Sequence, residues 1–266
     1  MMYFAGLCVW CGMMYKYRKD LHKYQHSLTA LIVVSLIEEF LWALVAIDYN
    51  NHGALNYGIV GVGIFFSACK LTGIRFLLLL VGLGYAIVVD SISKIALFVA
   101  IFISLGYFAT AAADAYIRMQ ALQQPTSNSY SLTTAGFLIA FNAILIFWIC
   151  YATYTTMKKA KNEKNEKYDM YKKLIIIFGI ICGIAITAFF VVVGITFSGL
   201  QDEAYKWYWL LNTYWDFIYF SINVYMAYLW RPSPNNQRFA YIHVDNNDHK
   251  HVELEESIRS NNEEQV

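Results

Sequence analysis

The stretch "YGIVGVGIFFSACKLTGIRFLLLLVGLGYAIVV", residues 57–89, decides how many times this chain crosses a membrane. As one helix it would reach about 50 Å at 1.5 Å per residue. A bilayer core needs only about 20 apolar residues. The run is therefore either one long, tilted helix that extends beyond the lipid, or two spans broken near Thr72-Gly73.

The composition places the whole chain in a membrane. Of 266 residues, 58% are hydrophobic and 15% are charged, against about 45–50% and 25% in a soluble domain. The lipid bilayer is therefore the expected partner. Six further apolar runs have the character of spanning helices: 2–15, 26–47, 95–117, 133–156, 174–197 and 207–230.

Lysine and arginine favour a single helix for residues 57–89. Consider seven spans with the N-terminus outside or lumenal. The inner loops and the near tail then hold 14 lysine and arginine residues, whereas the outer loops hold only Arg118 and Lys206. This asymmetry is what the positive-inside rule expects. Splitting the run would move the lysine-rich loop 157–173 to the other side. We therefore predict an all-α seven-transmembrane bundle with a cytosolic C-terminus.

The two ends of the chain differ in kind. The first apolar run is short, so we expect the sequence to begin inside or at the edge of the first helix of a longer protein. The predicted bundle covers residues 1–231, and residues 232–266 are predicted to be a disordered, acidic cytosolic tail because 240–266 is polar. Tyr241-Ile-His-Val244 has the shape of a sorting signal read by cytosolic adaptors, a short pattern that also arises by chance.

Several function classes find no support in these residues. No basic patch suited to nucleic acid is present, and the five scattered cysteines suggest neither a disulfide framework nor a metal site. Residues 207–230 contain no lysine for a retinal Schiff base. No phosphate-binding loop or hydrolase motif appears. We therefore predict a protein without a cofactor and without enzymatic activity.

Five of the charged residues within the apolar runs are candidates for a polar site, because each charge in a membrane costs about 2.5–3.5 kcal/mol on insertion scales. They are Glu38, Glu39, Lys70, Arg75 and Asp216. Counting from the inner helix ends puts Glu38, Arg75 and Asp216 at one level, about 20 Å deep, and Lys70 about 7–8 Å further out. Asn142, Asn212 and Asn223 are neutral polar residues in the same runs.

These charges have three interpretations. They form a buried ion pair that docks the second and third helices, or they line a polar cavity or ion path, or one glutamate is protonated or reaches the interface. We expect Glu38 to face the interior and to meet either Arg75 or Lys70. Glu39 points about a quarter-turn away and should matter less. The closing sequence Trp230-Arg231-Pro232 is interpreted as an anchor, a snorkelling cation and a helix stop.

Three stretches in order resemble the lung seven-transmembrane receptor family, also called GOST proteins. "MMYKYRKDLHKYQHSLTALIVVSLIEEFLWALVAIDYN" is similar to the family's first inner loop and second helix. "SACKLTGIRFLLLLVGLGYAIV" is similar to its third helix, and "YLWRPSPNNQRFAY" (228–241) to the end of its seventh. The last stretch is most similar to the branch proposed to act as Golgi cation channels.

The resemblance implies a multi-pass Golgi or endomembrane protein with a role in membrane traffic, in glycosylation homeostasis or in receptor-like signalling. A cation channel through the bundle is the alternative, and a scaffold acting through the cytosolic loop and tail is a third hypothesis. The family carries a lumenal β-rich domain before the first helix. We expect that domain to lie outside the residues of this sequence, so its functions cannot be assigned to them.

Overall fold

The computed structural model describes residues 2–18, 23–85, 92–121, 128–162, 167–197 and 208–232. These residues form seven α-helices and no strand. The helices are α1 (Met2–Lys16), α2 (Lys23–His52), α3 (Tyr57–Gly82), α4 (Lys94–Ala121), α5 (Asn128–Asn162), α6 (Lys167–Phe197) and α8 (Tyr208–Leu229). The predicted all-α class is confirmed.

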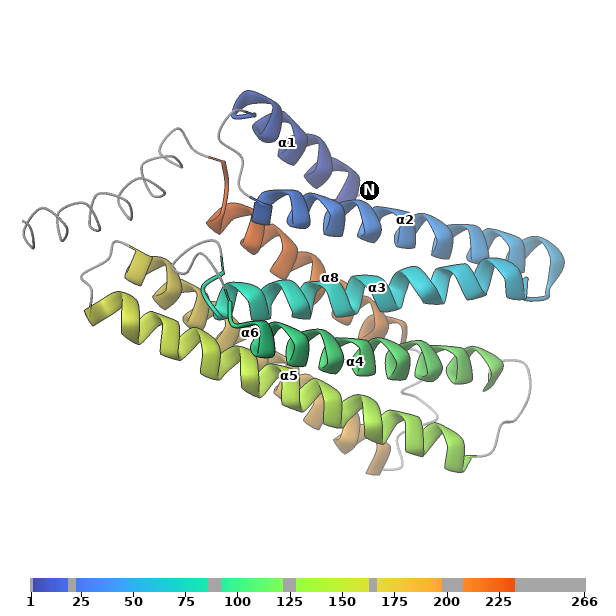
Figure 1. Cartoon of the computed structure of the whole chain (residues 1–266). Helices are drawn as coiled ribbons and strands as arrows, with labels where there is room; N and C mark the ends of the chain where they lie inside the picture. The colour runs from blue at the N-terminus through green and yellow to red at the C-terminus, as the bar shows by residue number, and fades with distance from the viewer. Residues whose placement is uncertain are drawn as a thin grey trace, which may run out of the picture.

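The helices pack as a bundle of long, roughly aligned rods (Figure 1). α2, α3, α4 and α5 each pack against the next, and α5 also contacts α3 and α6. α1 packs against α2 at one edge of the bundle and is inclined to it (Figure 1), and α8 contacts both α1 and α2. α3 is therefore surrounded by other helices, which explains why it is the most buried of the four most apolar spans.

Those four spans meet the requirements of length and hydropathy for crossing a membrane. They are Tyr24–His52, Tyr57–Gly82, Lys94–Gln120 and Thr133–Lys161. α2 and α5 run past the apolar stretches 26–47 and 133–156 at both ends. Polar residues can continue a helix beyond the hydrocarbon, so hydropathy alone underestimates helix length.

α3 passes through Thr72 and Gly73 without a break, as the single-helix interpretation requires, but it ends at Gly82 and not near 89. Gly84 adopts a φ of 80°, a left-handed conformation that suits glycine and stops the helix. Two other helices hold this end. The Thr156 hydroxyl donates to the Gly82 carbonyl (2.7 Å), and the Tyr171 hydroxyl donates to the Val81 carbonyl (3.0 Å).

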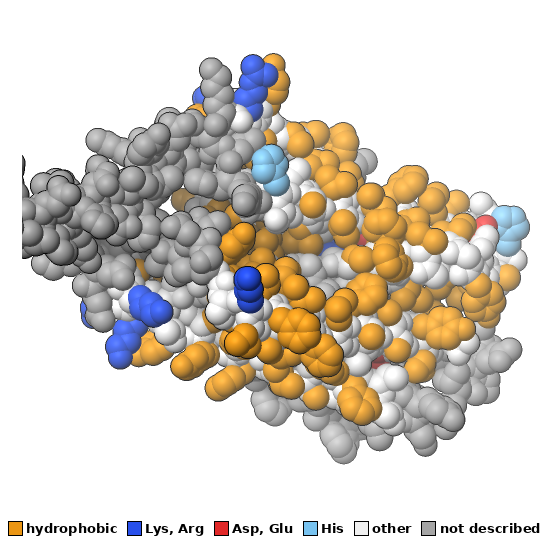
Figure 2. All heavy atoms as spheres, viewed as in Figure 1, with side chains coloured by type: hydrophobic (Ala, Val, Ile, Leu, Met, Phe, Trp, Pro, Cys, Tyr) orange, Lys and Arg blue, Asp and Glu red, His pale blue; other side chains and the backbone are white. Residues whose placement is uncertain are grey.

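On the face of the bundle drawn in Figure 2, most of the described surface is made of apolar side chains. Large hydrophobic residues such as Phe98, Phe102 and Phe147 are about 70% exposed or more. Such an apolar surface would be unfavourable in water and is favourable against lipid tails. Basic side chains gather at the end of the molecule where α1 ends and α5 meets α6 (Figures 1 and 2).

The closing motif ties the end of α8 to the beginning of α2. The Gln25 side-chain amide donates to the Trp230 carbonyl (3.1 Å), and the Trp230 ring lies 5.3 Å from the Tyr24 ring. Arg231 is exposed and lies over the Tyr228 ring, while Pro232 is buried. In the described residues the end of α8 thus packs against the beginning of α2, and Arg231 points away from the bundle.

An ion cluster joining α2, α3 and α8

A buried ion pair joins the two helices of the α2–α3 hairpin. Lys70 Nζ lies 2.6 Å from Glu38 Oε2, and both side chains are more than 95% buried. The other oxygen of Glu38 accepts two hydrogen bonds, from Trp42 Nε1 (3.0 Å) and Ser67 Oγ (2.8 Å). Both oxygens of this carboxylate are therefore satisfied, which offsets much of the cost of burying it.

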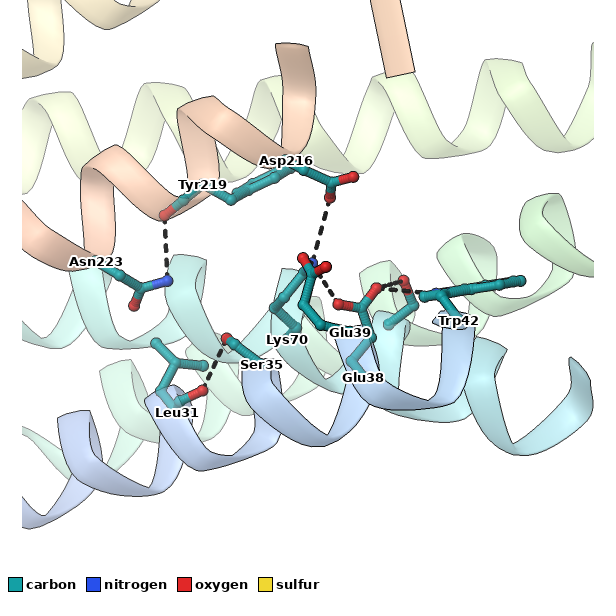
Figure 3. Close-up of polar contacts among 10 residues, drawn as sticks. Leu31, Ser35, Glu38, Glu39, Trp42, Lys70, Asp216, Tyr219 and Asn223 are labelled. Atoms are coloured by element: carbon teal, nitrogen blue, oxygen red, sulfur yellow. Dashed lines mark hydrogen bonds and ion pairs between the residues drawn. The ribbon is translucent and has the colours of Figure 1, made fainter. Parts of the chain in front are cut away.

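Two further carboxylates lie near the same ammonium group (Figure 3). Asp216 Oδ1 on α8 lies 3.3 Å from Lys70 Nζ, and Glu39 Oε1 lies 3.9 Å from it. The Asp216 and Glu39 side chains are 56% and 44% exposed. We call Glu38, Glu39, Lys70 and Asp216 the Lys70 cluster. If all four groups are ionised, it carries two more negative charges than positive ones.

Arg75 lies elsewhere on α3, in a group of neutral partners. Its guanidinium donates to Asn142 Oδ1 on α5 (2.8 Å), to the Tyr219 hydroxyl on α8 (2.7 Å) and to the Leu71 carbonyl (2.9 Å). It also lies 4.5 Å from the centre of the Tyr107 ring on α4. Within the described residues Arg75 forms no ion pair. This group, the Arg75 cage, joins α3 to α4, α5 and α8.

Of the two partners considered for Glu38, the structure therefore places Lys70 against it and Arg75 away from it. The estimate that put Glu38, Arg75 and Asp216 at one depth is wrong for Arg75. It counted from Val89 as the inner end of the helix, but α3 ends at Gly82. Counted from Gly82, Lys70 lies about 18 Å along the axis and Arg75 only about 10 Å. Lys70 is thus the residue level with Glu38.

The remaining predicted residues are distributed as follows. Asn142 binds Arg75, and the Asn223 amide donates to the Tyr219 carbonyl (3.1 Å) within α8. The side chain of Asn212, and Tyr241 and Val244 in the tail, lie outside the described residues. Among the side chains that are described, no group of three or more His, Cys, Asp or Glu residues is arranged to hold a metal ion.

Comparison with known proteins identifies the family. A model of the GOST seven-transmembrane domain matches residues 1–237. The chain belongs to the GOST family. It is 28% identical to transmembrane protein 87A of Xenopus tropicalis over 232 residues, 85% of this chain and 41% of the relative. It is 26% identical to human transmembrane protein 87B over 236 residues, 85% of this chain and 40% of the relative.

An uncharacterized protein of Schizosaccharomyces pombe is 27% identical over 248 residues, which are 87% of this chain and 47% of that protein. The chain thus spans less than half the length of the curated relatives that it matches. The family match supports the seven-helix membrane fold of this GOST protein.

Sequence reasoning missed four residues of these two groups. Trp42 follows Glu38 by one helical turn, and Ser67 precedes Lys70 by one turn. Residues three or four apart share a helix face, so helical spacing could have indicated both. Tyr219 follows Asp216 by three residues in the same way. Nothing in the sequence pointed to Tyr107, because its contact with Arg75 depends on how α4 packs against α3.

Chemically, the Lys70 cluster joins three helices through one ammonium group. Glu38 belongs to α2, Lys70 to α3 and Asp216 to α8, and the exposed oxygens are those of Glu39 and Asp216. A cation or hydrogen-bond donor that approached these oxygens would compete with Lys70 for them. It would thereby change the electrostatic attraction between α8 and α3.

Proposed function

We propose that this GOST protein is a non-enzymatic, receptor-like membrane protein of Golgi or nearby endomembrane traffic. Its N-terminus faces the lumen and its C-terminus the cytosol, as the lysine distribution favours. Membership of the family supports the membrane-embedded part of this proposal. The resemblance of the three quoted stretches and the short Tyr241–Val244 pattern are the reasons for the Golgi location, with cytosolic sorting adaptors as partners.

The observation that carries the receptor-like role is the mixed exposure of the Lys70 cluster. Lys70 and Glu38 are buried, whereas Glu39 and Asp216 keep about half of their surface accessible. A ligand that binds the accessible carboxylates changes the attraction between α8 and Lys70, and so shifts the position of α8. A receptor needs this coupling between an accessible group and a helix.

The test compares two variants in cells that lack the protein. Asp216→Asn weakens the link between α8 and Lys70. The matched control, Asp48→Asn, makes the same chemical change in the Asp48–His52 pair on α2 (2.9 Å), whose histidine is exposed. We expect the tagged, full-length wild type to localise to the Golgi and to restore the maturation of secreted glycoproteins. Asp216→Asn should restore it less well than Asp48→Asn.

Localisation only at the plasma membrane or in mitochondria would contradict the endomembrane assignment. Equal rescue by Asp216→Asn and Asp48→Asn would contradict a role for the Lys70 cluster. The lumenal domain found upstream in the family makes it advisable to use the longest natural form of the protein in these cells.

Cation conduction is the second candidate function, and the charge of the same cluster favours it. Three carboxylates lie within 4.0 Å of one ammonium group, and rings of Asp and Glu attract cations in channels. Planar bilayers that contain the purified chain should then show cation-selective currents, and Glu38→Gln should reduce them. Bilayers without currents for correctly folded protein would favour the receptor-like role.

A further inference from the structure

We propose that the outer face of α5 binds an anionic phospholipid, with the acyl chains on its apolar part and the headgroup on lysines near its C-terminal end. The proposal rests on the membrane-embedded fold and is independent of the receptor-like or channel role. It concerns a different surface from the Lys70 cluster. On the proposed topology this lipid belongs to the cytosolic leaflet.

Along one face of α5 the exposed side chains change from apolar to aromatic to basic toward the C-terminal end of the helix. Phe147, Tyr151 and Tyr154 are exposed and follow one another at helical spacing, and Lys158 and Lys161 continue the same stripe. Apolar, aromatic and basic side chains thus follow in the order of hydrocarbon, interface and headgroup. The stripe matches the depth profile of one membrane leaflet.

The apolar part of this face is hollowed. A shallow depression of about 560 Å³ is lined by Ala143, Ile144, Phe147, Trp148 and Tyr151. All five described lining residues belong to α5, and Phe147 and Tyr151 among them are exposed. Its residues carry no charge, so it suits an acyl chain, and it lies on the same helix face as the two lysines.

The basic part of the site lies where α5 and α6 pack closely against the rest of the bundle. On the opposite face of α5, Thr156 and Ala160 are buried, and Tyr171 of α6 is fully buried and bonded to the end of α3. The last turns of α5 and the first turns of α6 are therefore packed against the bundle. Five lysines on these turns of α5 and α6 are exposed: Lys158, Lys159, Lys161, Lys172 and Lys173.

Charge decides which headgroup fits. Against these five exposed lysines the described part of this end presents one exposed carboxylate, that of Asp169. Each Lys or Arg near a membrane surface contributes about 1 kcal/mol to binding anionic lipid. A zwitterionic headgroup gains little from such a surface. The occupant is therefore an anionic phospholipid, for which phosphatidylserine is the simplest probe.

Native mass spectrometry of the purified full chain in detergent can test the site. The chain is titrated with phosphatidylserine and with phosphatidylcholine of the same acyl chains. The test variant is Lys158→Gln/Lys161→Gln. The matched control, Lys16→Gln/Arg18→Gln, removes two exposed cations from the end of α1, at the same end of the bundle.

We expect phosphatidylserine to bind at least about tenfold more tightly than phosphatidylcholine. The α5 variant should lose about fivefold to thirtyfold in affinity for phosphatidylserine and keep its affinity for phosphatidylcholine. The α1 control should stay within about twofold of the wild type. Retained melting temperatures would show that all variants are folded, as expected for exposed lysines.

Equal binding of the two lipids would overturn the proposal, as would equal losses in the α5 and α1 variants. The acidic segment 240–266 is the competing occupant, since it has seven acidic residues against two lysine or arginine residues. If a peptide of this sequence displaced phosphatidylserine from the purified chain, the surface would belong to the tail and not to a lipid.

Discussion

Lys70 and Arg75 are two cations on one helix, five residues apart, and they are stabilised in different ways. Lys70 lies among three carboxylates, one of them buried with it at 2.6 Å. Arg75 has an amide, a tyrosine hydroxyl, a backbone carbonyl and an aromatic face. The compact ammonium is balanced by opposite charge, and the planar guanidinium by several neutral acceptors at once.

Because of this difference, substitution of each cation leaves different groups without a partner. Loss of Lys70 leaves a buried Glu38 carboxylate without its counter-ion. Loss of Arg75 leaves neutral groups, whose unmet hydrogen bonds cost less than an unpaired charge. The two positions should therefore differ in stability effect, although both are cations within the same span.

Lys70→Met should have the largest effect, a loss of about 3–5 kcal/mol in the free energy of unfolding, because Glu38 remains buried and uncompensated. The measurement is unfolding in mixed micelles by titration with sodium dodecyl sulfate. The double variant Lys70→Met/Glu38→Leu should recover part of the loss. A double variant less stable than Lys70→Met would show that Glu38 does not depend on Lys70.

Arg75→Met should cost about 2–3 kcal/mol in the same titration, since Asn142 and Tyr219 each lose a charge-assisted hydrogen bond. Arg75→Lys should recover little, because a single ammonium cannot reproduce the fork that reaches α5 and α8 together. If Arg75→Lys were as stable as the wild type, charge alone would be sufficient at this position, as it is at Lys70.

Tyr219→Phe should cost about 1.5 kcal/mol, because it removes the hydroxyl that accepts the 2.7 Å hydrogen bond from Arg75 and keeps the ring. Tyr228→Phe is the matched control, since Tyr228 is an exposed residue of the same helix. We expect no measurable loss of stability from it. Equal losses of stability from the two variants would show that the Tyr219 hydroxyl does not stabilise the protein through Arg75.

Glu39→Gln should have the smallest effect, below about 1 kcal/mol, because the side chain is half-exposed and lies 3.9 Å from Lys70. Its consequence for stability should be smaller than that of Glu38→Gln, although the two residues are adjacent. Thermal melting of the two variants side by side checks this. A larger loss for Glu39→Gln would reverse the assignment of the buried glutamate.

The sequence was sufficient for the seven-helix class, because span number follows from hydropathy and lysine placement, two properties of the chain itself. It was also sufficient to select Glu38 and Lys70 as buried charges, since the cost of exposure to lipid applies to any bundle.

The end of α3 was missed because Gly84 stops the helix while residues 83–89 are still apolar. That error moved Arg75 to the wrong depth.

The neutral partners of Arg75 could not be predicted in the same way. Asn142 and Tyr219 lie 67 and 144 residues from Arg75 in the sequence, and only the packing of α5 and α8 against α3 brings them together. Hydrophobic periodicity indicates which residues are buried. It does not indicate which helices are neighbours.

Two double-mutant cycles test most directly the central claim, that Glu38 is paired with Lys70 and not with Arg75. The first combines Glu38→Gln with Lys70→Met, and the second combines Glu38→Gln with Arg75→Met, each measured by the unfolding titration. We predict a coupling energy of about 2 kcal/mol or more in the first cycle and below about 0.5 kcal/mol in the second. Comparable coupling in both cycles, or stronger coupling to Arg75, would contradict the claim.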